Sequence, residues 1–230
     1  MDFLAGGGRS PSEITRLTGV PRTTVRDWLR GPPFQDVPSA SPPNPPTAEY
    51  AYLLGMYLGD GSISRGARCY RLRITADAGY PSVISECAEA MQAVVPKNRV
   101  SVFPRTDGSR CVDISAYSNV WPLLFPQHGR GKKHERRIIL KPWQQAIVDE
   151  EPQQFLRGLL HSDGSRVLNR VGKQTYPRYF FKQRSADIRA IFVQVCTQLG
   201  VTVSKAGASQ LSIARRRDVA FVDGFVGAKA

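Results

Sequence analysis

The stretch YLLGMYLGDGSIS at residues 52–64 decides the fold, because FLRGLLHSDGSRV at residues 155–167 repeats its pattern. Four residues recur at identical spacing: Gly55, Asp60, Gly61 and Ser62 in the first copy, and Gly158, Asp163, Gly164 and Ser165 in the second. Each copy is typical of an apolar helix that ends at Asp-Gly. One Asp-Gly pair is usually only a helix stop, but two matching copies predict an internal repeat.

The segments after the two motifs predict the same order of elements. After the first motif, a strand at 72–75 precedes a helix from about Pro81 to Val95 and two strands, at 99–103 and 110–117. After the second, a strand at 179–182 precedes a helix from about Ala186 to Leu199 and strands at 201–205 and 210–216. We therefore predict an α+β fold of two related halves, 48–150 and 151–230, the second stopping early.

Small residues four apart lie on one face of each motif helix. Gly55 and Gly59 share a face in the first helix, and Gly158 and Ser162 share one in the second. Because small residues let helix backbones approach closely, we predict that the two helices pair across a pseudo-twofold axis. That pairing would bring together the aspartates that end them.

Two carboxylates placed together at helix C-termini repel each other and oppose the helix dipoles. Hard divalent cations reverse both costs, since carboxylate oxygens are their preferred ligands. The formal net charge of +13, from 32 Lys and Arg against 19 Asp and Glu, favours nucleic acid as partner. A membrane partner is disfavoured because the longest apolar run, 50–58, is too short to span. Together these features predict metal-assisted phosphodiester chemistry.

LLGMYLGDG (53–61) and LRGLLHSDG (156–164) resemble the two signature motifs of LAGLIDADG homing endonucleases, and the resemblance extends over 48–230. It implies a pseudo-twofold pair of αββαββα halves whose saddle-shaped antiparallel sheets lie in the DNA major groove. It also implies a monomer that cuts both strands of a long, specific double-stranded DNA target with Mg²⁺, as in intron homing. The implied metal ligands are the carboxylates of Asp60 and Asp163 and the carbonyls of Gly59 and Ser162.

The resemblance also implies basic and amide side chains around the metals. Gln183 occupies such an amide position, whereas its counterpart is Ala76, so we expect two unequal sites. For the catalytic lysines, Lys132 is the first choice in GRGKKHERR (129–137), Lys133 the second, and Lys229 the candidate in the second half. Each lysine fits a phosphate anchor or a solvated surface position equally well.

Alternating strands predict where DNA is contacted, because one face packs on helices and the other is left free. Side chains that suit phosphates and base edges lie on the free faces or beside them. The candidates are Arg71, Arg73, Arg178, Lys182, Arg184, Gln210, Ser212 and Arg216. An ordinary solvated sheet face is the alternative interpretation.

The N-terminal segment 1–31 resembles a small helix-turn-helix unit of bacterial DNA-binding proteins. Ser10 and Pro11 open a helix that ends at Gly19, and Pro21 opens a second helix. The second helix offers Arg22, Thr23, Thr24 and Arg26 to DNA. The stretch 32–47 holds seven prolines, which predicts a semi-rigid linker.

The four cysteines are widely spaced and include no CxxC pair, which disfavours a zinc finger. For a chain of this size without an export signal we expect reduced thiols and a cytoplasmic location, in a bacterial or phage context. Two other functions use the same surfaces. One is a transcriptional regulator that binds DNA without cutting it, and the other is an intron RNA maturase. A regulator has no need of the acidic pair, so the presence of both aspartates favours the nuclease.

Overall fold

The computed structural model describes residues 10–19, 21–29 and 44–227. The chain divides into two compact units, Met1–Ala40 and Ser41–Ala230. The division falls inside the stretch 32–47 that the sequence predicts as a linker, although residues 32–43 lie outside the described part. In that part no helix is both long and apolar enough to cross a bilayer.

The N-terminal unit contains helices α1 (Pro11–Thr18) and α2 (Arg22–Leu29). Ser10 caps α1: its hydroxyl accepts from the Glu13 amide, and the Glu13 carboxylate accepts from the Ser10 amide. Gly19 then ends the helix at φ 70°, a conformation that favours glycine. Ile14 and Val25 are buried, so the two short helices share a small apolar contact.

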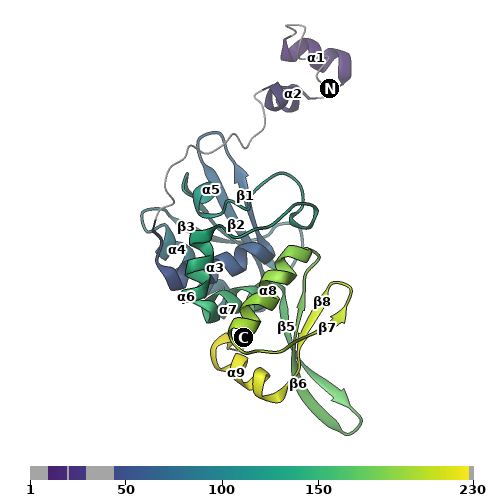
Figure 1. The fold of residues 1–230 in the computed structure, drawn as a ribbon. Coiled ribbons are helices and arrows are strands. Elements are labelled where there is room, and N and C mark those ends of the chain that lie inside the picture. The colour runs from purple at the N-terminus through teal and green to yellow at the C-terminus, as the bar shows by residue number, and fades with distance from the viewer. Residues whose placement is uncertain (1–9, 20, 30–43, 228–230) are drawn as a thin grey trace. The chain divides into compact units, whose positions relative to one another are not determined.

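The second unit contains two successive sets of helices and strands (Figure 1). The first half consists of α3 (Thr47–Asp60), β1 (Gly61–Arg65), β2 (Tyr70–Asp77), α4 (Pro81–Val94), β3 (Val100–Pro104), β4 (Cys111–Tyr117), α5 (Trp121–Leu124), a 3₁₀ turn η1 (Lys133–Glu135) and α6 (Pro142–Glu150). The second half consists of α7 (Pro152–Asp163), β5 (Gly164–Val171), β6 (Gln174–Lys182), α8 (Ala186–Gln198), β7 (Val203–Gly207), β8 (Gln210–Ile213) and α9 (Arg216–Val226).

Each half builds a four-stranded antiparallel sheet, in the order β1-β2-β4-β3 and β5-β6-β8-β7. The hairpins after the motifs share one register, with Gly61 opposite Ile74 and Gly164 opposite Phe181. The predicted α+β fold of two related halves is therefore confirmed.

The end of the chain agrees with the αββαββα order that the resemblance implies, and differs from the early stop that the residues alone indicate. The last strand stops at Ile213, and Arg216 begins helix α9, so the second half does have a closing helix. Val219, Val222 and Val226 are buried at helical spacing, a periodicity that outweighs the apparent alternation before it.

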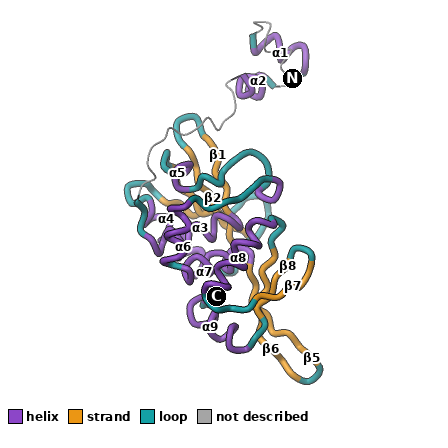
Figure 2. The backbone as a smooth tube through the Cα atoms, viewed as in Figure 1, coloured by secondary structure: helices purple, strands orange, loops and turns teal. Residues whose placement is uncertain are grey.

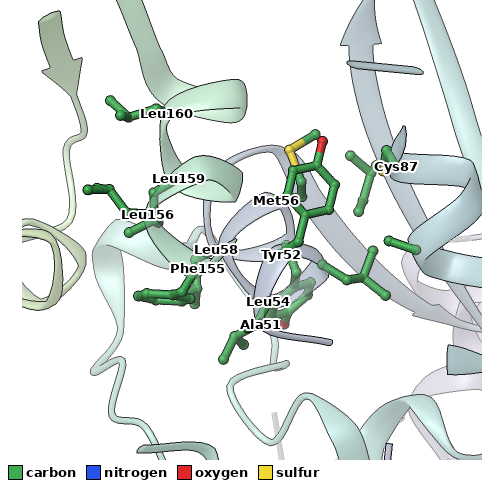
Figure 3. Close-up of a cluster of buried hydrophobic side chains, with 14 of the residues drawn as sticks. Ala51, Tyr52, Leu54, Met56, Leu58, Cys87, Phe155, Leu156, Leu159 and Leu160 are labelled. Atoms are coloured by element: carbon green, nitrogen blue, oxygen red, sulfur yellow. The ribbon is translucent and has the colours of Figure 1, made fainter. Parts of the chain in front are cut away.

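The core of the second unit surrounds α3, in which every residue from Tyr50 to Leu58 is buried. A helix that is apolar all round belongs inside a protein. Figure 3 shows Met56, Leu58, Leu156 and Leu159 of α3 and α7 in one continuous cluster. The core therefore runs across the boundary between the two halves and fixes one half against the other.

Candidate active site and nucleic-acid interface

Helices α3 and α7 touch through their backbones. A Cβ atom on Gly55 would lie 2.5 Å from the Phe155 carbonyl oxygen and 2.7 Å from the Leu159 nitrogen. A Cβ on Gly158 would overlap the Tyr52 carbonyl oxygen. Because any side chain here would force the helices apart, the pairing predicted from small residues has a direct steric basis.

The same pairing holds the two motif aspartates at one place. Asp60 is the last residue of α3 and Asp163 the last residue of α7. Gly59 lies against Ser162, and a Cβ on Gly59 would lie 2.8 Å from Oδ2 of Asp163. The Asp163 carboxylate thus reaches the turn of α3 that carries Asp60. Asp60 is exposed and Asp163 half-buried, so both are open to a ligand from solvent.

Lys133 is the lysine that the structure brings to these helix ends. Its Nζ donates to the carbonyl oxygens of Tyr57 at 2.5 Å, Leu58 at 3.0 Å and Gly59 at 2.6 Å. The last carbonyls of a helix lack partners within the helix, although that of Tyr57 also accepts from the Gly61 amide, and a cation there is favoured by the dipole. All three ammonium protons are thus used in closing the end of α3.

The pKa of Lys133 is lowered to about 8, chiefly because burial disfavours the ammonium ion. The carboxylates of Asp163 and Asp60 act in the opposite direction, and the charge of Arg136 adds to the lowering. Lys133 is therefore within electrostatic reach of both aspartates while its hydrogen bonds go to α3. Its ammonium offsets part of the repulsion between the carboxylates.

Lys132, the first choice from sequence, does not reach this place. Its side chain is 72% exposed and its ammonium lies 3.8 Å from the Glu135 carboxylate. The sequence does not distinguish which of the two adjacent lysines reaches the helix ends. The local backbone decides, because η1 begins at Lys133 whereas Lys132 before it is extended. Lys229 lies outside the described residues.

Gln183 contacts the second aspartate. Its amide Nε2 donates to Oδ2 of Asp163 at 2.7 Å, and its Oε1 accepts from the Ser185 amide at 3.1 Å. By the shared register of the hairpins, Ala76 is the equivalent residue in the first half. Ala76 is buried and offers no polar group. The two carboxylates therefore have unequal surroundings, as the sequence predicts.

The oxygen atoms at this place are of the kind that Mg²⁺ takes. Both motif carboxylates lie at the paired helix ends, next to the Gly59 carbonyl to which Lys133 donates, and Mg²⁺ is commonly held by one or two carboxylates while keeping several waters. Within the described ranges no three His, Cys, Asp or Glu side chains form a metal cage. The donors present fit a hydrated hard cation and would not suit a soft metal.

His161 links three helices through its two ring nitrogens. Its Nε2 donates to the Val226 carbonyl at 2.9 Å, and its Nδ1 lies 3.0 Å from the Tyr52 hydroxyl. The ring is buried and joins α7 to α3 and to the end of α9. Burial raises the pKa of Tyr52, so that hydroxyl keeps its proton.

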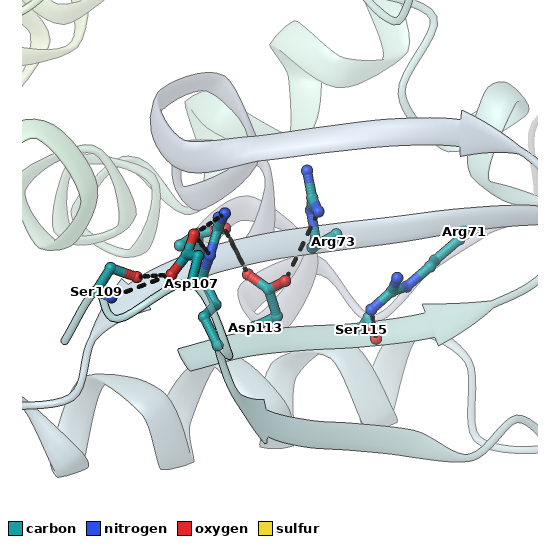
Figure 4. A network of polar contacts seen from close by, with 8 residues as sticks. Arg71, Arg73, Asp107, Ser109, Asp113 and Ser115 are labelled. Carbon is teal, nitrogen blue, oxygen red and sulfur yellow. Dashed lines mark hydrogen bonds and ion pairs between the residues drawn. The ribbon is translucent and has the colours of Figure 1, made fainter. Parts of the chain in front are cut away.

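The outward face of the first sheet carries two groups of polar contacts, one at Arg71 and one around Asp113 (Figure 4). Arg71 donates to the Ser115 hydroxyl at 3.0 Å, and Arg73 lies 3.7 Å from the Asp113 carboxylate. Thr75 donates to the same carboxylate at 2.8 Å, and Arg105 lies 4.0 Å from it. Asp113 thus lies within ion-pair distance of two arginines, of which Arg73 is on the face predicted to contact DNA and Arg105 is hydrogen-bonded to Asp107.

The second sheet exposes only some of the side chains that the sequence predicts to contact DNA. Arg178 lies over the Phe180 ring at 5.6 Å, while Lys182 and Arg184 are exposed at the end of β6. Gln210 is half-buried opposite Lys182.

Two candidates on this side need correction. Ser212 is only 3% exposed, because its small side chain lies on a central strand opposite Phe180. Arg216 is exposed but opens α9, so it does not belong to the sheet face.

In the N-terminal unit, Arg22, Thr23 and Arg26 are exposed along α2, as a recognition helix requires. The side chain of Thr24 lies outside the described part.

No family model and no curated relative matches the chain. Solved structures do match it. The N-terminal LAGLIDADG domain of DUF199/WhiA has a TM-score of 0.50 at 15% identity, over 84% of this chain and 85% of that one. The homing endonuclease I-DmoI has a TM-score of 0.50 at 15% identity in mesophilic variants, over 79% of this chain and 97% of that one.

I-DmoI in complex with DNA and Mn also has a TM-score of 0.50, at 18% identity over 79% of this chain and 98% of that one. At such identities the likeness concerns the fold. The chain has the LAGLIDADG fold, with its two motif helices at the centre.

Proposed function

We propose that the chain is a site-specific endonuclease that hydrolyses both strands of duplex DNA with a divalent metal, Mg²⁺. One observation carries the proposal: two helices in backbone contact hold Asp60 and Asp163 at one place, where both carboxylates act on the half-buried Lys133. A protein built only for stability gains nothing from two acids at paired helix ends. The fold neighbour I-DmoI, solved with DNA and Mn, supports the same reading.

The residues divide into three roles. The carboxylates of Asp60 and Asp163 would hold the metal, which when bound polarises the phosphate and activates a water. Gln183 holds the Asp163 carboxylate in one orientation through its amide. Lys133 fixes the end of α3, on which Asp60 stands, and places a positive charge beside the site.

The outward sheet faces would bind the duplex. Arg71 and Arg73 on the first sheet, and Arg178 and Lys182 on the second, offer guanidinium and ammonium groups to phosphates and base edges. The net charge of +13 makes such binding favourable and sensitive to salt.

Cleavage of a large randomised duplex pool in Mg²⁺, with the cut ends captured and sequenced, tests the proposal. Asp60→Asn and Asp163→Asn keep the shape of the side chain and remove its charge, so each should abolish double-strand cutting while DNA binding persists. A long consensus at the ends cut by the unchanged chain would identify the target. Full cutting by either variant would remove the metal assignment.

The two-helix unit at the N-terminus favours a second candidate, a transcriptional regulator that binds DNA without cutting it. The exposed Arg22, Thr23 and Arg26 of α2 give such a regulator its own reading helix. The same experiment separates the two functions. A consensus among bound duplexes with no enriched cut ends would favour the regulator.

A further inference from the structure

Hairpin β5–β6 extends beyond the rest of its sheet. Strand β6 pairs with β5 from Gln174 to Phe181 but pairs with β8 only from Tyr179 to Lys182. The five residues 174–178 and their partners on β5 therefore form a two-stranded ribbon without a third strand. Figures 1 and 2 show these strands running outward, away from β7, β8 and the helices.

The first half has no such extension. Strand β2 pairs with β4 from Arg71 to Asp77, which is nearly its whole length. Its hairpin with β1 ends at the pair Arg65–Tyr70, one residue beyond the last pair with β4. The two sheets thus match at their motif ends and differ at their far ends.

The ribbon carries charge of one sign. Residues 164–182 include no Asp or Glu and five cations: Arg170, Lys173 and Arg178 lie in the ribbon, and Arg166 and Lys182 lie at its base. Residues 172–176 at its tip are exposed, and so is Arg170. A two-residue turn, with Gly172 at φ 61°, joins the strands and places Lys173 at the tip.

The base of the ribbon is held firmly. Arg166 donates from Nε and Nη2 to the two oxygens of the Asp223 carboxylate on α9, at 2.7 and 2.8 Å. The Tyr179 hydroxyl donates to the same carboxylate at 2.6 Å. These bonds fix the direction in which an otherwise marginal two-stranded ribbon leaves the sheet.

We infer that this ribbon is an additional DNA-binding element that lengthens the contact of the second half alone. A two-stranded ribbon fits the major groove, and a patch of cations without acids suits a phosphate backbone. At about 3.3 Å per residue, five residues span ~17 Å, or roughly five base pairs of duplex. The protected DNA therefore extends further on the side of the second half than on the side of the first.

This inference rests on the proposed function for its duplex DNA, but it does not depend on cutting. It is tested with the full chain in EDTA, on the consensus duplex recovered from a bound randomised pool. Hydroxyl-radical footprinting measures both ends of the protected region. A wild-type chain that binds this duplex in EDTA but does not cut it in Mg²⁺ would refute the nuclease and leave the inference about the ribbon intact.

The main variant shortens the ribbon and keeps each remaining side chain on the same face. Deleting residues 168–169 and 176–177 removes two cross-strand pairs, so the inward and outward alternation is kept. The loss of two residues per strand should withdraw protection by roughly two base pairs at one end of the footprint. The other end should stay where it is.

A second variant removes charge and keeps length. Arg170→Gln, Lys173→Gln and Arg178→Gln together should lower the slope of log affinity against log salt by as much as about 2.7, at ~0.9 for each phosphate contact. Its matched control, Arg170→Lys with Arg178→Lys, keeps the charges and should keep the slope.

Three results would overturn the inference. They are an unchanged footprint in the shortened variant, equal shortening at both ends, and a charge-removed variant with the wild-type salt slope. A wild-type chain that binds no duplex DNA would overturn the inference together with the proposed function.

Discussion

Replacing Gly158 by alanine tests whether backbone contact joins the two halves. The new Cβ would overlap the Tyr52 carbonyl oxygen and lie 3.0 Å from the Met56 nitrogen and 3.1 Å from the Gly55 Cα. All three neighbours are backbone atoms of α3, so no rotamer change relieves the clash. Relief requires α7 to move away from α3.

The expected effect combines two opposing contributions. Alanine gains about 1 kcal/mol over glycine in a helix interior. Overpacking in a well-packed core costs about 1–3 kcal/mol, and the backbone neighbours place this site at the upper end. The net loss in the free energy of unfolding should be about 2 kcal/mol, or ~4–8 °C in Tm for a chain of this size.

Gly224→Ala provides the matched control. Gly224 lies within α9, and a Cβ there would meet nothing within 4 Å. The helix preference then acts alone, so this variant should gain about 1 kcal/mol and ~2–4 °C. Calorimetry and urea unfolding of both variants measure the difference. If G158A is as stable as G224A, the helices are not held by backbone contact, and the reasoning about the site they support fails with it.

Four further predictions concern the site and its surroundings. Lys133→Met should reduce DNA cutting at least tenfold and lower the urea midpoint, because the end of α3 loses its three hydrogen bonds. Lys132→Met, the control, should cut DNA at a rate near wild type. Rates of plasmid linearisation measure both variants. Gln183→Ala should slow cutting of one DNA strand more than the other, which strand-specific end labelling detects; equal slowing of both strands would contradict the assignment to Asp163. Hydrogen bonds from Arg166 and Tyr179 lower the pKa of Asp223 below its ordinary 3.8. This carboxylate therefore stabilises the fold above about pH 4, and the stabilisation is lost as the pH falls through the folded pKa. Asp223→Asn should have a lower urea midpoint than wild type at pH 7, and the difference between the two midpoints should be smaller at pH 3. Deleting residues 1–47 should weaken DNA affinity while the remainder folds, and an insoluble product would count against two separate units.

The sequence predicts most of the fold, because the repeated motif fixes both the helix ends and the order of the elements that follow. The two sheets, and the register that pairs Ala76 with Gln183, agree with that order. Only the resemblance implies the closing helix α9. The residue pattern alone extends the last strand to 216, although β8 ends at Ile213 and Val219, Val222 and Val226 follow at helical spacing.

The candidate site is less completely readable from sequence. Asp60 and Asp163 follow from the repeat, since each ends a motif helix. The choice between Lys132 and Lys133 depends on a 3₁₀ turn that no pattern in GRGKKHERR specifies. The burial of Ser212 depends on cross-strand neighbours, and alternation shows only the face on which a residue lies.

The complete burial of α3 has a consequence for how the protein folds. Helix α3 is covered on every side and contacts α7 through Gly55, so either half alone would leave buried apolar surface exposed to water. The second unit should therefore unfold in one cooperative step, without a stable half-folded species. A fragment ending near residue 150 would expose the glycine face of α3. In the full chain that face packs on the similar glycine face of α7, so two fragments would associate through their α3 helices as a symmetric dimer.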